Sequence, residues 1–433
     1  MKPELTQNLW ERYGFSDNPF DTRALSMSPE NKLSVSKAFI VGESRQSSVT
    51  IMNNFLRGRG GGRIVVEGAV GVGKTTFVNY HRYKWEYEAG TKLLTPVQEI
   101  SVQADWGVRE FLISILAATA GRLALAMKPK EAQKDDLLNE ISALTGVLFK
   151  QTKGLSGGLS AFGFGANVSG SKAITVQIGE ISTDKLKQYL HALLERIHHN
   201  GYAGALFHLN NLELLARKDI DRLRYFFDDI RDFLQIENLY FIFVGYVGMF
   251  QEAIAPTERV RSIFLGKPIV LPVLSLEEVL SAIQKRYELL AIQPEHWIPP
   301  VDNDLIVYLY HAFEGKIRFI MDAITTLVIH LPESATATMS SEAAKLFLRE
   351  LTFQNLEILP LTKREIEELK VAIRLTHFTN SELSKALKKK KQQITKLINR
   401  LMHFNLIYQT GQEGKHKYYT ISPELMVCNE NKE

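Results

Sequence analysis

Residues 68–75 read Gly-Ala-Val-Gly-Val-Gly-Lys-Thr and fit the phosphate-loop pattern G-x-x-x-x-G-K-[ST] without a mismatch. Glycines allow a tight turn whose backbone N–H groups point at phosphate oxygens, and the helix that follows adds the positive end of its dipole. In this pattern Lys74 reaches the β- and γ-phosphates, and the Thr75 hydroxyl binds Mg²⁺. The predicted nucleotide contacts are Gly68, Gly71, Gly73, Lys74, Thr75 and Thr76.

The flanking residues favour a true phosphate loop over an accidental glycine-rich turn. Residues 63–67 are typical of a short buried strand, and residues 76–82 continue as a helix. Strand, loop and helix therefore follow in the order that this kind of site requires. We expect the chain to bind ATP with Mg²⁺.

The length and composition are those of a multidomain globular protein. A chain of 433 residues exceeds what one hydrophobic core usually holds, so two or three domains are expected. The sequence has no apolar run of about 18 residues and no charged-then-apolar leader, so neither a membrane span nor secretion is expected. The single Cys428 excludes a disulfide framework and a Cys-based zinc site within one chain, and it fits a cytoplasmic location.

The positive charge is concentrated near the C-terminus. The whole chain has a formal net charge of +4. Residues 361–433 hold 14 Lys and Arg against 8 Asp and Glu, a net of +6, whereas the preceding residues hold 38 against 40, a net of −2. This asymmetry predicts a polyanionic partner for the C-terminal segment.

Strand-like and helical stretches alternate around the phosphate loop. Further strands are expected at residues 96–102, 203–209, 239–245 and 268–271, with helices at 108–120, 183–199 and 219–234. Such alternation predicts an α/β fold with a parallel sheet sandwiched by helices. A Gly/Ser-rich insert near 150–180 interrupts this alternation and is typical of a β-hairpin. The hairpin is expected either to contact DNA or a second subunit, or to be a surface excursion with no separate role.

Two asparagines follow the strand at 203–209. P-loop ATPases normally place an acid there to hold the water shell of Mg²⁺, often followed by a Glu that orients the attacking water. Asn210 and Asn211 can accept hydrogen bonds, but they carry no charge and cannot act as a base. We therefore expect Asn210 to contact the nucleotide site and hydrolysis to be slow, with Glu99 and Glu213 as open candidates for a substitute carboxylate.

Three motifs in this order resemble the AAA+ P-loop ATPases of the origin-recognition or STAND-like type. They are the phosphate loop, Arg-Val-Arg-Ser at 259–262, and Glu-Gly-Lys-Ile-Arg at 314–318. The segments Asn-Pro-Phe at 18–20 and Val-Gly-Glu at 41–43 resemble those that open the same family. The resemblance covers about residues 15–350.

The resemblance implies roles for two arginines. Arg259, with Arg261 as second candidate, falls where the family has the arginine finger that reaches a neighbouring subunit's nucleotide. Arg318 falls on the sensor arginine of the helical lid, which contacts the γ-phosphate of its own subunit. Arginine suits both roles because its fork matches phosphate oxygens and cannot be deprotonated. Asn210, Asn211 and the Gly-Tyr pair at 245–246 depart from the family pattern.

The C-terminal segment resembles a winged helix-turn-helix. Helices are expected at 362–375, 382–387 and 390–401, followed by strand-like pieces at 406–409 and 417–421. In this geometry the third helix enters a major groove and the hairpin lies along the backbone. The expected contacts with double-stranded DNA are Lys388, Lys389, Lys390, Lys391, Gln392, Gln393, Thr395, Lys396, Asn399, Lys415, His416 and Lys417. Winged domains also dock proteins, so a protein partner is the alternative.

These expectations define four regions and one functional hypothesis. The regions are an N-terminal arm at 1–40 that packs across the nucleotide domain, an AAA+ core at 41–272, a helical lid at 273–355 and a winged helix-turn-helix at 356–433. The hypothesis is an ATP switch that oligomerises on DNA in an initiator-like, transposon-associated or defence role. One alternative is an ATP-dependent transcriptional or signalling regulator. A second is an ATPase motor, although Asn210 and Asn211 argue against fast hydrolysis.

Overall fold

The computed structural model divides the chain into two compact units. The first contains residues 46–69 and 74–271, and the second contains residues up to 45, 70–73 and 272 onward. The residues that the structure describes are 8–58, 60–103, 105–145, 181–216, 220–294, 296–332, 334–413 and 416–429. The hairpin predicted near 150–180 lies outside the described residues.

The first unit is built on a six-stranded sheet whose strand pairs are all parallel. The strand order is β2 (Leu93–Leu94), β4 (Gly204–Asn210), β5 (Leu239–Gly245), β1 (Gly62–Glu67) and β6 (Ile269–Val270), with β3 (Ile100–Ser101) also paired to β4. The predicted α/β class is therefore confirmed. The expected strand at 96–102 is reduced to β3, since Pro96 has no N–H to donate to a ladder.

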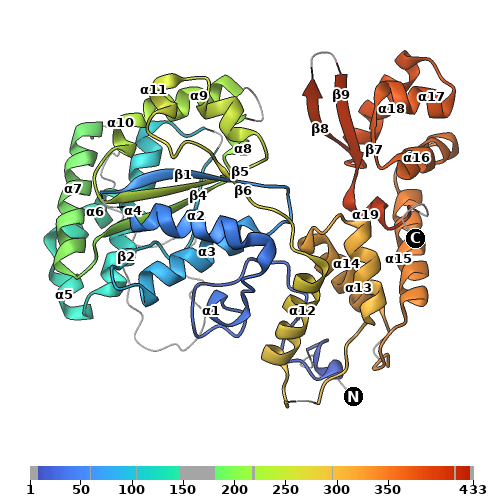
Figure 1. The fold of residues 1–433 in the computed structure, drawn as a ribbon, viewed down its shortest axis with the longest axis horizontal. Helices are drawn as coiled ribbons and strands as arrows, with labels where there is room; N and C mark the ends of the chain where they lie inside the picture. The colour runs from blue at the N-terminus through green and yellow to red at the C-terminus, as the bar shows by residue number, and fades with distance from the viewer. Residues whose placement is uncertain are drawn as a thin grey trace, which may run out of the picture. The chain divides into compact units, whose positions relative to one another are not determined.

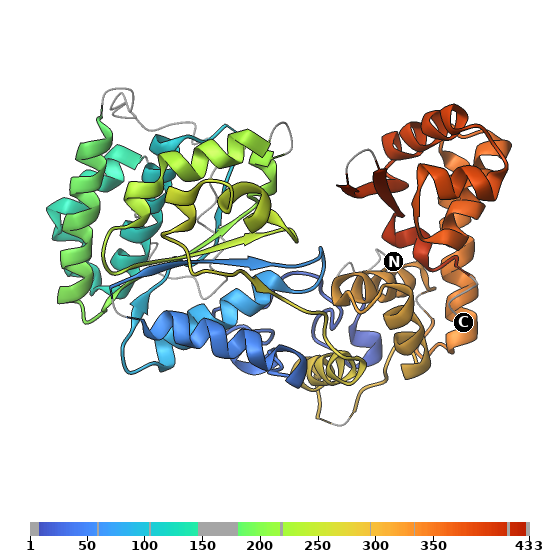
Figure 2. The ribbon, with the colours of Figure 1, turned by 45° about the horizontal axis from the view of Figure 1, so that its top comes forward.

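Helices cover both faces of this sheet, as Figure 2 shows in blue on one side and in green on the other. Helices α2 (Gln46–Arg57) and α3 (Lys74–Tyr83) contact one face, and α4 (Val108–Ala126), α6 (Asp136–Thr145), α7 (Thr183–His199) and α9 (Ile220–Asp229) form the core on the other. Side chains alternate along a strand, so Phe207 of β4 points into that second core while His208 and Asn210 point to the α3 face.

Shorter elements complete the first unit. They are η3 (Lys84–Glu88), α5 (Pro129–Lys134), α8 (Glu213–Ala216), α10 (Arg231–Leu234), η5 (Phe250–Ile254) and α11 (Glu258–Arg261). A chain of phenylalanines fills the core beneath them, and the rings of Phe207 and Phe241 stack with centroids 5.3 Å apart. Aromatic packing of this density fixes the strands whose ends carry the polar residues described below.

The second unit contains a group of four helices at the place of the predicted lid, called the lid below, and the N-terminal arm packs against them. The lid helices are α12 (Leu276–Leu290), α13 (Asn303–Ala312), α14 (Ile317–His330) and α15 (Ser341–Ile358), and the arm adds η1 (Glu11–Tyr13), α1 (Val35–Ala38) and η2 (Glu43–Arg45). Trp10, Tyr13, Phe15 and Phe20 are buried in the lid core, and Phe15 stacks on Tyr287 at 5.1 Å. These arm residues therefore pack in the same unit as the lid helices, a contact that the sequence did not predict.

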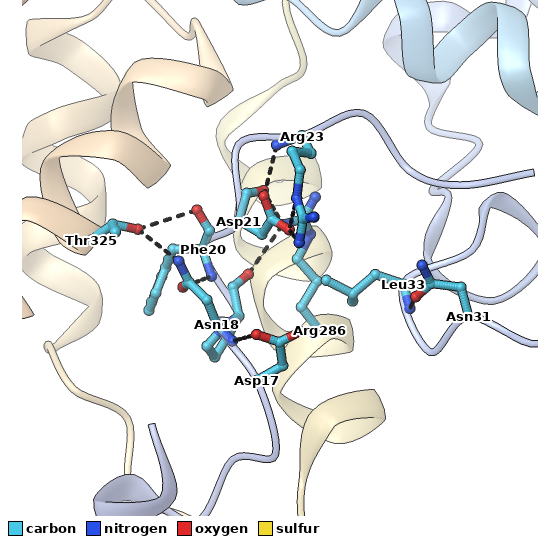
Figure 3. A network of polar contacts seen from close by, with 10 residues as sticks. Asp17, Asn18, Phe20, Asp21, Arg23, Asn31, Leu33, Arg286 and Thr325 are labelled. Atoms are coloured by element: carbon cyan, nitrogen blue, oxygen red, sulfur yellow. Dashed lines mark hydrogen bonds and ion pairs between the residues drawn. The ribbon is translucent and has the colours of Figure 1, made fainter. Parts of the chain in front are cut away.

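A polar network reinforces this packing (Figure 3). The buried guanidinium of Arg286 on α12 donates hydrogen bonds to the carbonyls of Pro19 (3.1 Å) and Asp21 (2.8 Å). Burial lowers the pKa of Arg286 to about 10, and the charge of Asp21 opposes this shift. The Asn-Pro-Phe turn at 18–20 is thus a structural anchor of the arm on the lid.

The C-terminal part of the second unit contains the elements expected from the sequence, one more strand and a short final helix. They are α16 (Lys363–Leu375), β7 (His377–Thr379), α17 (Asn380–Leu387), α18 (Lys391–His403), β8 (Ile407–Glu413), β9 (His416–Ile421) and α19 (Pro423–Met426), shown in orange and red in Figure 1. Thr362 and Thr379 form capping boxes at the starts of α16 and α17. The unexpected strand, β7, joins the hairpin in an antiparallel sheet of order β7-β9-β8.

The lid and the C-terminal part share one hydrophobic core. The Tyr308 hydroxyl on α13 donates to the Val427 carbonyl at 2.8 Å, and Arg349 on α15 donates to the same oxygen at 3.2 Å. The two parts therefore behave as a continuous packed body. Within the described residues, no helix combines the length and apolarity needed to cross a membrane.

Candidate functional site

The phosphate loop connects β1 directly to α3. Strand β1 ends at Glu67 and α3 begins at Lys74, so the loop lies at the carboxyl edge of the parallel sheet, where ligands of open α/β folds bind. Gly71 and Gly73 have φ of +82° and +95°, in the left-handed region that favours glycine. A Cβ at Gly71 would lie 3.2 Å from the Cβ of Arg318. Both glycines are therefore required by the loop's shape.

The lysine of the loop is folded back along the turn. Lys74 Nζ donates to the carbonyls of Gly68 (2.8 Å) and Ala69 (3.0 Å). Thr75 and Thr76 follow in the first turn of α3, where the helix leaves N–H groups without intrahelical partners. This set of an ammonium, hydroxyls and helix N–H groups fits a Mg²⁺–triphosphate in chemistry and in order.

A buried arginine braces the loop from the side. Arg45 is 3% exposed and donates to the carbonyls of Val72 (2.6 Å) and Pro272 (Nε 3.1 Å and Nη2 3.0 Å). Burial lowers the pKa of Arg45 to about 10, and the charge of Glu278 opposes this shift, so the guanidinium stays charged at neutral pH. Sequence reasoning missed Arg45, because Pro272 is 227 positions away.

A buried glutamate braces the end of β1. The Glu67 carboxylate accepts hydrogen bonds from the backbone N–H groups of Gly248 (2.9 Å) and Phe250 (2.6 Å). This ties the last residue before the loop to the segment that follows β5. The sequence placed Glu67 in the strand but gave no sign of this partner.

The two asparagines lie at the end of β4, beside β3. The Asn211 N–H donates to the Asn210 side-chain oxygen at 2.9 Å, and Asn211 Nδ2 donates to Ser101 Oγ at 3.3 Å. Asn211 has φ of +62°, a conformation that Asn tolerates better than most residues. The carboxyl ends of β1, β4 and β5 share one sheet edge, so an uncharged pair stands where an acid was expected.

The two candidate substitute carboxylates differ in surroundings. Glu213 is the first residue of α8, two residues after Asn211. Burial lowers the pKa of the fully buried Arg82 to about 10, and the charge of Glu99 opposes this shift. Both residues stay candidates for the substitute carboxylate.

The arginines assigned by resemblance occupy different environments. Arg259 on α11 forms a bidentate ion pair with Asp228 on α9, with Nε 2.5 Å from Oδ1. Its side chain is 62% exposed, and Arg261 is exposed as well. Arg318, the second residue of α14, is exposed, and its backbone N–H donates to the Gly71 carbonyl at 3.2 Å. Residues 70–73 of the phosphate loop belong to the same compact unit as Arg318, and Arg318 lies beside this part of the loop.

The loop before Arg318 contacts the C-terminal strand β7. The Glu314 carboxylate accepts hydrogen bonds from His377 Nε2 (2.7 Å) and Lys316 Nζ (2.9 Å). Burial alone would raise the pKa of Glu314, but the hydrogen bonds from His377 and Lys316 outweigh it and lower the pKa to about 2. Sequence reasoning did not foresee this contact, since β7 itself was missed.

Most of the residues expected to contact DNA lie on exposed surfaces of α17, α18 and the hairpin. The exposed ones are Lys388, Lys390, Lys391, Gln392, Gln393, Thr395, Lys396, Asn399, His416 and Lys417. Lys389 differs, because its side chain is only 18% exposed and forms an ion pair with Glu368 on α16. Lys415 lies outside the described residues.

No protein-family model matches the sequence, and no curated protein matches it. Among solved structures, the chain is similar to the ORC2 protein of Aeropyrum pernix in its ADPNP–ADP complexes, at 15% identity and a TM-score of 0.46 over 96% of this chain and 98% of that one. The ADP form of that protein gives 14% and 0.45 over 97% and 98%. A RuvB variant of Thermotoga maritima gives 10% and 0.39 over 90% and 95%. At these TM-scores the likeness assigns no fold, so the α/β assignment rests on the sheet itself.

Proposed function

We propose that the protein is an AAA+-type ATP switch that binds Mg²⁺–ATP at the phosphate loop. The observation that carries this proposal is the loop between β1 and α3, with Gly71 and Gly73 at positive φ and Lys74 at the first position of the helix. Lys74 would leave the loop carbonyls for the phosphates, and Thr75 would hold the metal. Arg318, beside Gly71, is the proposed γ-phosphate sensor.

We also propose that hydrolysis is slow. Asn210 and Asn211 leave the end of β4 without a charge for the water shell of Mg²⁺, and neither amide can take a proton from water. Removing one stabilising group from a P-loop site typically costs a few kcal/mol in the transition state, or about 10²-fold in rate. ATP binding depends on the loop and survives this loss.

The C-terminal part is proposed to bind double-stranded DNA as a winged helix-turn-helix. The exposed polar face of α18 presents Gln392, Gln393 and Asn399 to base edges, while Lys388, Lys390, Lys396 and Lys417 suit phosphates. Each phosphate that a lysine neutralises steepens the log–log salt dependence by about 0.9. Lys389 is left out of this set because Glu368 holds it.

Self-association is the third part of the proposal. Arg259 sits on an exposed helix end, from which a finger can reach the nucleotide of a neighbouring copy. An arginine used in this way completes the neighbour's site and makes assembly depend on bound ATP. Nucleotide binding, self-association and DNA binding would then depend on one another.

The test measures duplex binding and oligomer mass with ATP, with ADP and without nucleotide. The matched variant is Lys74→Ala, which should lose ATP binding and behave as the nucleotide-free protein in every condition. ATP-dependent assembly that grows with duplex length supports the switch, whereas binding to one palindromic site favours a transcriptional regulator. If neither nucleotide changes DNA binding or mass, the proposal is wrong.

A further inference from the structure

Five residues connect the phosphate loop with the C-terminal part of the second unit. At one end of this segment, Glu314–Arg318, the Arg318 N–H donates to the Gly71 carbonyl at 3.2 Å. At the other end, the Glu314 carboxylate contacts His377, the first residue of β7, at 2.7 Å. A group in the proposed DNA-binding part therefore contacts the loop that carries the proposed phosphate sensor.

The backbone of this loop needs support to keep its shape. Glu314 and Gly315 both lie in the left-handed region, with φ of +55° and +72°. Glutamate rarely adopts this conformation, and such a residue persists only where its surroundings hold it. Backbone hydrogen bonds from Glu314 to His311 (3.3 Å) and from Gly315 to Tyr310 (2.8 Å) close this turn, and the bonds from Lys316 and His377 to opposite oxygens of the Glu314 carboxylate fix its side chain.

Holding the two parts together does not require the contact. The shared core and the bonds from Tyr308 and Arg349 to Val427 already join the lid to the C-terminal part. The His377 side chain is 54% exposed, and ion pairs at such sites contribute little to stability. The placement of His377 is therefore better explained by the loop that it orients than by domain packing.

We infer that His377 is a positioning residue, which holds Glu314 and thereby sets the start of α14 so that Arg318 can reach a γ-phosphate. This inference rests on the proposed function, and specifically on Arg318 as the sensor. Strand β7 leads directly into α17, whose N-cap is Thr379. Duplex DNA bound to α17 and α18 would then change ATP affinity through β7, and ATP would change DNA affinity by the same factor.

The test compares Kd values for ATP and ADP, with and without duplex DNA, in the full chain. The variants are His377→Ala, Arg318→Ala and His330→Ala. His330 is a matched control, because it is the exposed last residue of the same helix, α14, at the end away from Arg318. His377→Ala should weaken ATP binding about fivefold relative to ADP, as expected for one charge-assisted hydrogen bond at a half-exposed site.

The conservative variant His377→Gln separates positioning from a general disturbance. Glutamine can still donate to Glu314, so it should recover part of the ATP preference that alanine loses. Glu314→Ala removes the acceptor from the other side and should give a loss similar to that of His377→Ala. In both losing variants, DNA should change ATP affinity less than in wild type, and ATP should change DNA affinity less by the same factor.

The outcomes distinguish this inference from the proposed function. A loss in Arg318→Ala and His377→Ala, with His330→Ala at the wild-type value, supports it. A loss in Arg318→Ala alone overturns the positioning role and leaves the ATP switch standing. If Arg318→Ala keeps the full preference for ATP, the sensor assignment fails and the inference falls with it.

Discussion

The carboxylate of Asp228 on α9 forms a bidentate ion pair with the guanidinium of Arg259 on α11, the candidate arginine finger. The arginine is 62% exposed, and water and salt screen an exposed ion pair of this kind, so it contributes little to stability. A desolvated contact between arginine and phosphate is stronger. Under the proposed self-association, the phosphates of a neighbour's nucleotide would therefore compete with Asp228 for this side chain.

Replacing Asp228 by Asn should promote ATP-dependent assembly. The variant removes the charge that competes with a neighbour's phosphates, so half-assembly should occur at a several-fold lower protein concentration, up to about fivefold. Mass photometry or sedimentation with ATP measures the shift. Asp221→Asn is the control, because Asp221 pairs with Arg224 on the same helix. If both variants assemble at the same protein concentration as wild type, Arg259 is not part of the interface.

Replacing Arg45 by Ala should damage both stability and nucleotide binding. The change leaves the carbonyl of buried Val72 without its donor, which costs about 1–3 kcal/mol, and it also removes the bonds to the more exposed carbonyl of Pro272. It also frees the phosphate loop, so ATP and ADP affinity should fall together. Denaturant unfolding and nucleotide titration measure the two effects. Arg57→Ala, at the exposed end of α2, should change neither. Unchanged nucleotide affinity in Arg45→Ala would rule out a bracing role.

The sequence identified the phosphate loop because that signal is local, with its glycines, lysine and threonine inside eight residues. It also predicted the alternation of elements that makes the sheet parallel. It could not give the partners of Arg45 or Glu67, since Pro272 and Phe250 meet them only after the chain has folded. Strand β7 was missed because its three residues pair with β9, about forty positions away, and read locally as the cap of α17.

Neighbouring lysines should have different roles in the C-terminal part. Lys389→Ala should destabilise the fold, because it leaves the buried Glu368 with one fewer cation. Removing one partner of a buried ion pair costs about 3–5 kcal/mol, and this range is the upper limit for the variant. Lys390→Ala should leave stability unchanged and reduce the salt dependence of DNA binding by about 0.9 in log–log slope. Thermal unfolding and DNA titration at several salt concentrations separate the two. The reverse pattern would contradict the orientation of α17 and α18.

The only cysteine should react slowly in the folded protein. Burial raises the pKa of the Cys428 thiol to about 11, and the hydrogen bond with Thr352 only partly opposes this shift. Because the thiolate is the reactive form, its fraction at pH 8 falls by about 10²-fold relative to an exposed cysteine. Reaction with a thiol reagent, followed with and without urea, measures the difference. Fast reaction without denaturant would show that α19 and the end of the chain are open.

Restoring an acid at the end of β4 should raise the rate of ATP hydrolysis. Asn210→Asp places a carboxylate on the α3 face of the sheet, where it can hold the water shell of a metal bound through Thr75. The expected gain is up to about 10²-fold in kcat with little change in ATP affinity, because the group acts on the transition state. Asn211→Asp is the matched control, since its side chain contacts Ser101 of β3. A gain in the control but not in Asn210→Asp would assign the metal-side position to Asn211. No gain in either variant, with ATP still bound, would place the limit on hydrolysis elsewhere, at the attacking water that neither asparagine can deprotonate.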